Sequence, residues 1–173
     1  MITKFCLIGL NVRKSTTAFI FWDYRMQIKI RVLKYNELSE ALKLIESTFM
    51  LFVAPNYTDQ GVQSFLGFIS DEKNIRAMIF FGAFEDGELK GVMAVNADRS
   101  HICCLFVDAR NQNRGIARAL FNFLLKNSDN NCYTVNSSPY AIDFYRVLGF
   151  APTAPQQVSN GIKFTPMKFL RQK

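Results

Sequence analysis

Every long apolar run in this sequence has the length of a β-strand, and this limits the folds that the chain can adopt. The runs Phe5–Leu10, Met78–Phe84 and Ile102–Val107 are far shorter than the roughly 18 residues that span a bilayer. We therefore exclude a membrane protein. The chain has 173 residues, of which 49% are hydrophobic. It is long enough to bury one well-packed core.

Strand and helix signals alternate along the chain. Gln27–Leu33 alternates between apolar and polar residues as a strand does. Asn36 and Thr58 can each cap a helix, and Pro55 separates the two predicted helices. Apolar side chains recur at helical spacing in both, at Leu38, Ala41, Leu42, Ile45, Phe49 and Phe52 and at Val62, Phe65, Leu66 and Ile69.

The next three apolar segments read as strands. Ile75–Phe84 and Leu89–Asn96 are joined by a stretch that contains Asp-Gly, which is typical of a hairpin turn. His101–Val107 is continuously apolar and is therefore expected at the centre of the sheet.

The C-terminal third continues the mixed pattern. We expect a helix over Gly115–Leu125, a short strand over Cys132–Val135 and a helix over Ala141–Leu148. A final hairpin turns at Asn160-Gly161 into a strand over Ile162–Leu170, where Pro166 is expected to mark an edge or a bulge. The fold class is therefore a single α/β domain.

Residues 1–25 differ from the rest, because the apolar pattern settles only after Met26. We interpret them as an N-terminal leader outside a domain of residues 26–173. The leader carries +3 of the formal net charge of +7, from four basic residues and one acidic residue. The other basic residues are scattered and form no Lys/Arg-rich run. These positions weaken a nucleic-acid interpretation, and a modest basic excess suits an anionic small ligand just as well.

The cysteines give no sign of a metal site. Cys6, Cys103, Cys104 and Cys132 form no C-x-x-C pair, and the chain has a single histidine, His101. These are too few ligands for zinc, so no metal is expected. Reduced thiols favour a cytoplasmic location.

A strand, a polar loop and an amphipathic helix follow one another over residues 105–120. Gly115 and Ala117 lie in the first turn of the predicted helix. Unpaired N–H groups and the positive end of the helix dipole suit a phosphate there, and small residues let it approach the backbone. On spacing alone, the simpler explanation is favoured, because any strand–loop–helix junction can hold a glycine and one Gly-x-Ala is a weak motif.

Two motifs in order resemble the GNAT acetyltransferase superfamily. Gln112-Asn113-Arg114-Gly115-Ile116-Ala117 is similar to the family signature Q/R-x-x-G-x-G/A, with alanine where many members have glycine. Asn136 and a helix ending in Phe144-Tyr145-Arg146-Val147-Leu148-Gly149-Phe150 resemble the second landmark. The resemblance covers residues 26–173. It implies a mixed, mostly antiparallel sheet flanked by helices and splayed between the strands at 101–107 and 132–136.

The resemblance also implies an enzyme that moves an acetyl group from acetyl-CoA to the amine of a small molecule or peptide in a ternary complex. Backbone N–H groups of residues 113–117 would hold the pyrophosphate, and Gln112 would frame the loop. Free backbone groups of Phe106 and Val107 would pair with the pantetheine arm. Positive charge for the phosphates would come from Arg110, Arg114 and Arg118, each of which could equally belong to a solvated helix face.

Two residues are candidates for the chemistry. Tyr145 would supply a proton or a hydrogen bond to the departing thiolate; the alternative is a packing role beside Phe144 and Leu148. His101 begins the central strand and titrates in the range of a general base. A lone histidine at a strand end is more often structural, and a water chain could serve instead.

Other readings stay open at this stage. Phe49, Phe52, Tyr57 and Phe65 would wall an acceptor pocket or simply belong to the core. A CoA-binding regulatory module without catalysis is the alternative function, and a basic nucleic-acid binder is a third. A homodimer is compatible with the sequence.

Overall fold

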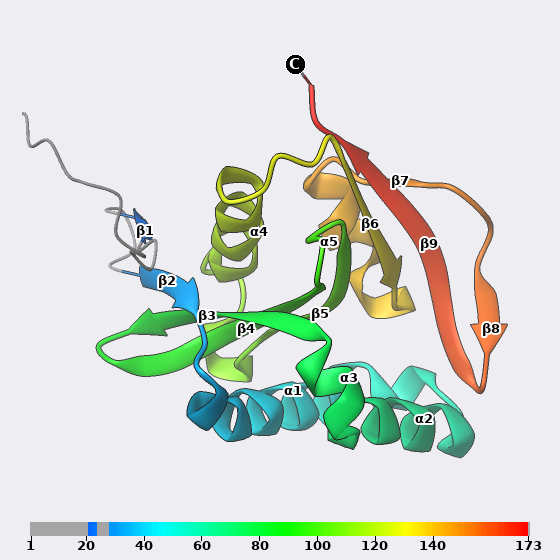
Figure 1. Ribbon diagram of the computed structural model, residues 1–173. Helices are drawn as coiled ribbons and strands as arrows, with labels where there is room; N and C mark the ends of the chain where they lie inside the picture. Colours follow the sequence, from blue (N-terminus) through cyan, green and yellow to red (C-terminus); the bar gives the residue numbers. More distant parts are fainter. Residues whose placement is uncertain (1–20, 24–27, 173) are drawn as a thin grey trace, which may run out of the picture.

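The computed structural model describes residues 21–23 and 28–172, and these form one sheet with helices on both faces (Figure 1). The strand order is β1-β2-β3-β4-β5-β6-β9-β7, with β8 also paired to β9. All neighbours are antiparallel except β5 and β6, which are parallel. The strands are β1 (Phe21–Asp23), β2 (Ile28–Val32), β3 (Met78–Glu85), β4 (Glu88–Asn96), β5 (His101–Val107), β6 (Cys132–Ser137), β7 (Ala151–Pro152), β8 (Gln157–Ser159) and β9 (Ile162–Leu170).

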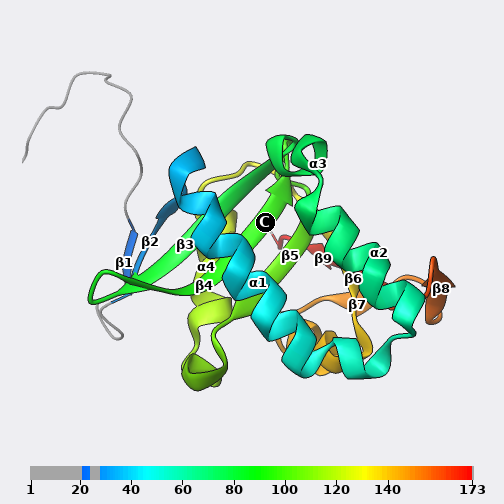
Figure 2. The same ribbon diagram turned by 90° about the horizontal axis from the view of Figure 1, so that it is seen from below.

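The helices divide between the two faces of the sheet (Figures 1 and 2). One face carries α4 (Ile116–Lys126) and α5 (Ile142–Val147), and the other carries α1 (Leu38–Phe52), α2 (Asp59–Ser70) and α3 (Glu72–Arg76). None of the helices within the described ranges is long and apolar enough to cross a membrane. The expected mixed, mostly antiparallel sheet between helices is confirmed.

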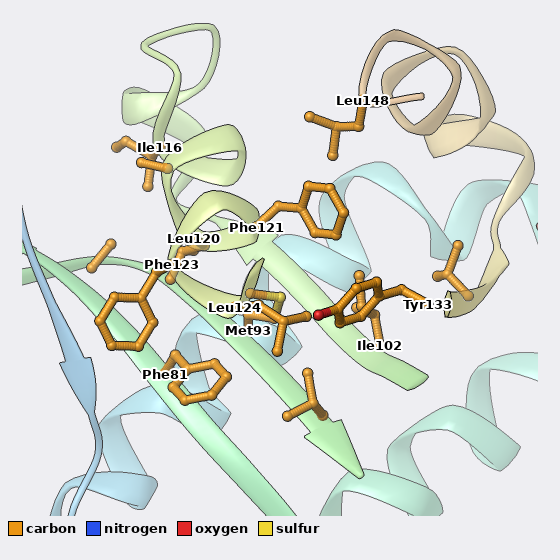
Figure 3. Close-up of a cluster of buried hydrophobic side chains, with 14 of the residues drawn as sticks. Phe81, Met93, Ile102, Ile116, Leu120, Phe121, Phe123, Leu124, Tyr133 and Leu148 are labelled. Carbon is orange, nitrogen blue, oxygen red and sulfur yellow. The ribbon is translucent and has the colours of Figure 1, made fainter. Parts of the chain in front are cut away.

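The α4 face holds the larger core (Figure 3). Helix α4 presents Ile116, Leu120 and Phe123 to the sheet, where Phe81 of β3 meets Phe123 edge-on at 5.3 Å between ring centroids. Met93 of β4 belongs to the same cluster. On the opposite face, the neighbours of these strand residues pack against α1 and α2, because successive strand side chains alternate between faces. Both faces are therefore buried, which explains the continuous apolar strands.

A β-bulge interrupts β5. Ala94 of β4 pairs with Cys104, and the next residue, Val95, pairs with Ile102, so Cys103 has no partner on β4. On its other side, β5 pairs with β6 only at His101 and Ile102 within the described chain. The strands part at the bulge, so the expected splay is present, and no strand of the described residues pairs with the β6-facing edge of β5 beyond Ile102.

Two local expectations are wrong. Asn36 does not cap α1, because it lies within the 3-10 turn Tyr35–Glu37 and Glu37 is the residue that precedes the helix. The strand predicted over Ile75–Phe84 begins only at Met78, because Asp71 caps α3 by accepting the N–H of Lys73 at 2.8 Å, and Ile75 lies in that helix. Pro166 was expected to mark an edge or a bulge. β9 lies between β6 and β7, but Pro166 itself has no paired residue on β7 or β8, so its position is a local edge of the described sheet. Its carbonyl accepts the N–H of Thr153, so the missing Pro166 N–H faces the gap between β7 and β8, where no ladder bond is needed.

The predicted leader lies largely outside the described residues. Of its residues, 21–23 form β1, which pairs with β2. That the domain needs no part of residues 1–25 stays a prediction.

Candidate active site

A cavity of about 960 Å³ lies where β5 and β6 part. Its walls come from β5, β6, the start of α4, the segment that leads into α5, helices α1 and α2, and the β8–β9 turn. Segments from most of the chain length therefore meet at this point of the sheet. Open α/β sheets bind ligands where neighbouring strands diverge in this way.

The loop before α4 forms one end of the cavity. Asp108 orders the loop by accepting the Arg110 N–H and an Asn111 side-chain N–H, each at 3.0 Å. Asn113 and Gly115 both have positive φ, at 60° and 79°, which asparagine and glycine tolerate. The backbone N–H groups of residues 112–118 donate to no described residue. The loop thus presents free donors at the positive end of a helix dipole, as an anion site requires.

The three arginines of this region differ in position. Arg114 turns away from the cavity to form a two-pronged ion pair with Glu85, at 2.6 and 2.8 Å, and it also donates to Asn111 at 2.7 Å. Arg110 lies 3.5 Å from Asp108. Arg118 lines the cavity, and no ion pair engages it within the described chain. Arg118 is therefore the best placed of the three to meet a phosphate.

His101 lies at the base of the splay, where β5 and β6 still pair. Its Nδ1 lies 2.8 Å from the Thr134 hydroxyl, which in turn is 3.4 Å from the Ser100 carbonyl. Burial lowers the pKa of His101 below its ordinary value of 6.5, and Asp98 partly opposes this. The imidazole is therefore neutral at pH 7, and it borders the cavity.

Tyr145 enters the cavity from α5. Its side chain is buried, with 5% exposed, and its ring packs edge-on to Phe150 and Phe144. Burial raises the pKa of its phenol well above 10, and neighbouring Cys104 adds to this. No hydrogen bond to the described chain engages the Tyr145 hydroxyl. The ring has a packing role, while the hydroxyl is protonated and free.

Aromatic side chains wall the α1–α2 side of the cavity. Phe49 stacks on Phe65 at 4.0 Å between centroids, and Phe106 of β5 meets Phe65 at 5.9 Å. Burial raises the pKa of Tyr57 to about 12. The four aromatic residues singled out in the sequence line the cavity and pack with the core beneath it. That they wall an acceptor pocket stays a prediction.

A contact across the cavity was not foreseen from the sequence. Tyr140 stacks on Phe52 at 5.5 Å between centroids, and its hydroxyl donates to the Gln112 side chain at 3.2 Å. Tyr140 thereby connects the end of α1 to the loop before α4. An isolated tyrosine after a proline carries no sequence signal for this role.

The α2 side is held to the C-terminal hairpin by two glycines in close contact. A Cβ on Gly61 would lie 2.6 Å from the carbonyl carbon of Gly161, and one on Gly161 would lie 2.9 Å from the Cα of Gly61. Gly161 has a φ of 76° in the turn between β8 and β9. Beside them, the Ser64 hydroxyl donates to the Asn160 carbonyl at 2.9 Å. The contact closes this side of the cavity.

Most of the predicted site residues converge on this one cavity. His101, Phe106, Val107, Gln112, Asn113, Gly115, Ile116, Ala117, Arg118, Asn136 and Tyr145 all line it. The Arg110 and Arg114 side chains are not part of its lining and lie beside Asp108 and Glu85 instead. Cys103, Tyr140 and Phe164 also line the cavity and were not predicted to.

The comparisons with known proteins agree with this geometry. A family model described as an acetyltransferase (GNAT) domain matches residues 53–171. The chain belongs to the GNAT acetyltransferase family. It is accordingly an acyltransferase, and the expected family is confirmed. None of the curated proteins compared with the sequence matches it.

Solved structures share the fold of this GNAT acetyltransferase. A GCN5-related N-acetyltransferase from Rhodopseudomonas palustris is similar with a TM-score of 0.72 and 18% identity, over 82% of this chain and 94% of its own. The PaiA N-acetyltransferase of Thermoplasma acidophilum, solved with coenzyme A, is similar with a TM-score of 0.62 and 18% identity, over 84% of this chain and 100% of its own. An N-acetyltransferase from Staphylococcus aureus is similar with a TM-score of 0.59 and 21% identity, over 83% of this chain and 97% of its own.

Proposed function

We propose that this GNAT acetyltransferase moves an acetyl group from acetyl-CoA to a primary amine by direct attack in a ternary complex, and that it does so in the cytoplasm. The observation that carries the proposal is the convergence of the free N–H groups of residues 112–118, the unpaired edge of β5 and the His101 and Tyr145 side chains on one cavity. The complex of PaiA with coenzyme A supports the same cosubstrate for this fold.

The cosubstrate fits the groups that the chain offers. The N–H groups of residues 113–117 would receive the pyrophosphate, with Arg118 adding positive charge. The edge of β5 at Phe106 and Val107 would pair with the pantetheine arm as an added strand, because β6 leaves that edge after Ile102. Asn136, on the facing strand β6, lines the same channel. The reactive thioester would then lie between β5 and α5.

The chemistry needs a neutral amine and a stabilised leaving group. The amine forms a C–N bond to the acetyl carbon while the C–S bond breaks, and His101 takes the proton that the amine loses. If the Thr134 hydroxyl donates to Ser100, it accepts from His101 Nδ1–H, which leaves Nε2 free as the base.

Tyr145 donates a hydrogen bond to the departing thiolate, which solvent then protonates to the thiol. The raised pKa of Tyr145 makes full proton transfer to a thiolate costly, since a free thiol titrates near 8.5. The same raised pKa keeps the Tyr145 phenol protonated, so that its O–H remains a hydrogen-bond donor over the pH range in which the amine reacts. A hydrogen bond that strengthens as charge develops on sulfur stabilises the transition state more than the ground state.

Calorimetry with acetyl-CoA and an assay for released CoA thiol test the proposal. Gly115→Glu places a carboxylate where the pyrophosphate would lie and should abolish acetyl-CoA binding. Gly87→Glu is the matched control, because Gly87 has a similar φ of 83° in a hairpin turn with open space around it. Equal acetyl-CoA affinity in both variants would show that the phosphate site lies elsewhere. Tight binding of acetyl-CoA, with no release of CoA thiol in the presence of any amine tested, would favour the regulatory module.

A further inference from the structure

The lining of the cavity is unusually poor in charge. Among the described residues that line it, none is aspartate or glutamate, and the basic ones are His101 and Arg118. Arg118 belongs to α4, on the cosubstrate side, and His101 is neutral at pH 7 because burial lowers its pKa. The part of the cavity away from α4 therefore has no charged side chain to pair with a charged substrate.

Aromatic rings form the wall of that part. Helices α1 and α2 lie on the opposite face of the sheet from α4 (Figures 1 and 2) and contribute most of the rings, while β9 adds one. The rings that face the cavity from these elements and β5 are Phe49, Phe52, Phe65, Phe68, Phe106 and Phe164. The Gly61–Gly161 contact seals this chamber against the C-terminal hairpin.

We propose that the acceptor is a monoamine with an apolar, preferably aromatic, body and no second charge. The inference rests on the proposed function and names the substrate class for it. Rings of the α1–α2 wall would pack against the apolar body of the acceptor, and removing that body from water supplies the affinity.

A second charge on the acceptor is disfavoured by the same wall. An additional ammonium of a polyamine or basic peptide would lose its hydration without gaining a carboxylate. A carboxylate on the acceptor would find only the neutral imidazole of His101. The single reacting amine is different, because its ammonium form is attracted to ring faces and desolvation then favours the neutral form that attacks.

Binding of amines to the full chain tests this class independently of turnover. Acetyl-CoA binding is measured first, and its absence would refute the proposed function alone. 2-Phenylethylamine, hexylamine and 1,4-diaminobutane are then titrated by calorimetry, with and without saturating CoA, so that the preference is read in either case. We expect 2-phenylethylamine to bind about tenfold or more tightly than the diamine. Equal affinities, a preference for the diamine, or no measurable monoamine binding would overturn the inference.

Two further arms sharpen the test. Ser159 is exposed at the rim of the chamber, so Ser159→Glu should give a second ammonium a partner and raise diamine affinity severalfold, whereas Ser159→Gln should not. If Ser159→Glu did not raise diamine affinity, the lack of a carboxylate in the chamber would not be the cause of the preference for monoamines. Acetyl-CoA is also compared with hexanoyl-CoA. If affinity rose by about fourfold for each added CH₂, the wall would hold an acyl chain instead, and the inference would be wrong.

Discussion

Gly61→Ala perturbs the contact that holds α2 to the C-terminal hairpin. The new methyl group would lie 2.6 Å from the Gly161 carbonyl carbon and 3.1 Å from the Ile162 nitrogen, both of which are backbone atoms that no rotamer change can move. The hairpin must therefore shift, and the hydrogen bond from Ser64 to Asn160 lengthens with it. A Cβ added to Gly67 in the same helix would meet no atom from another part of the described chain within 4 Å, so Gly67→Ala is a matched control.

The two substitutions should change stability in opposite directions. Overpacking of this kind costs about 1–3 kcal/mol, and a better helix former recovers at most about 1 kcal/mol. Gly61→Ala should therefore lower the free energy of unfolding by about 1–2 kcal/mol, or the Tm by about 2–8 °C at this chain length. Gly67→Ala meets no clash and should raise stability by up to about 1 kcal/mol.

Thermal unfolding followed by circular dichroism measures both values in the same buffer. Because the Gly61–Gly161 contact lies beside Ser64 and Asn160, which line the cavity, and not at the α4 loop, Gly61→Ala should raise the KM for the amine while leaving acetyl-CoA affinity unchanged. An unchanged or higher Tm in Gly61→Ala would refute the close backbone contact. A loss of acetyl-CoA affinity with an unchanged amine KM would refute the division of the cavity.

Three other predictions concern the site and the core. Tyr145→Phe should lower kcat by about 10²–10⁴-fold without changing Tm or acetyl-CoA affinity, because it removes only a hydroxyl that makes no hydrogen bond to a described residue. Full kcat in a folded variant would exclude Tyr145 from the chemistry. With saturating amine, the acid limb of the pH profile of kcat should lie below pH 6.5, because His101 must be neutral to act as base and burial lowers its pKa. Persistence of this limb in His101→Asn would assign it to another group. Glu37→Gln should lower the free energy of unfolding by about 1 kcal/mol at pH 7, because hydrogen bonds from Arg31 and the Lys34 N–H hold the Glu37 pKa at about 2. Urea unfolding should show this difference between variant and parent above pH 4.5 and its loss as the pH falls toward 2. A difference that does not change with pH would contradict the ion pair.

Periodic segments were predictable because their signal is local. The α4 stripe and the alternation of β2 encode the face that each element buries, and Thr58 caps α2 as expected by accepting the Gly61 N–H at 3.2 Å. The Gln112–Ala117 segment lies at the start of α4, as the resemblance implied from its position and its partner motif, and that it holds the cosubstrate stays a prediction. Residues 75–77 were predicted wrongly as strand because Ile75 continues the apolar pattern of the strand, whereas Asp71 caps a helix that extends through Ile75.

The rest of the site depends on contacts between distant segments. The bulge at Cys103 exists only relative to the register of β4, so the apolar run of β5 does not reveal it. Arg114 was assigned to the cosubstrate because its spacing fits the loop, but Glu85 in the β3–β4 hairpin captures its side chain. The bridge from Phe52 through Tyr140 to Gln112 joins three segments that are separated in the chain. Such pairings follow from tertiary packing and not from periodicity.

The position of β9 in the sheet has a consequence for how the protein is made. β9 is inserted between β6 and β7, and it carries Ile162 and Phe164 into the cavity, yet it is the last described strand to leave the ribosome. The strands β2 to β5 with α4 can pair during synthesis, since their contacts are closer in sequence. Until β9 emerges, β6 exposes an open edge that invites pairing with other chains. Cotranslational folding should therefore yield a nascent domain with the loop before α4 in place but without a closed cavity, and chaperone binding should concentrate at the β6 edge during that interval.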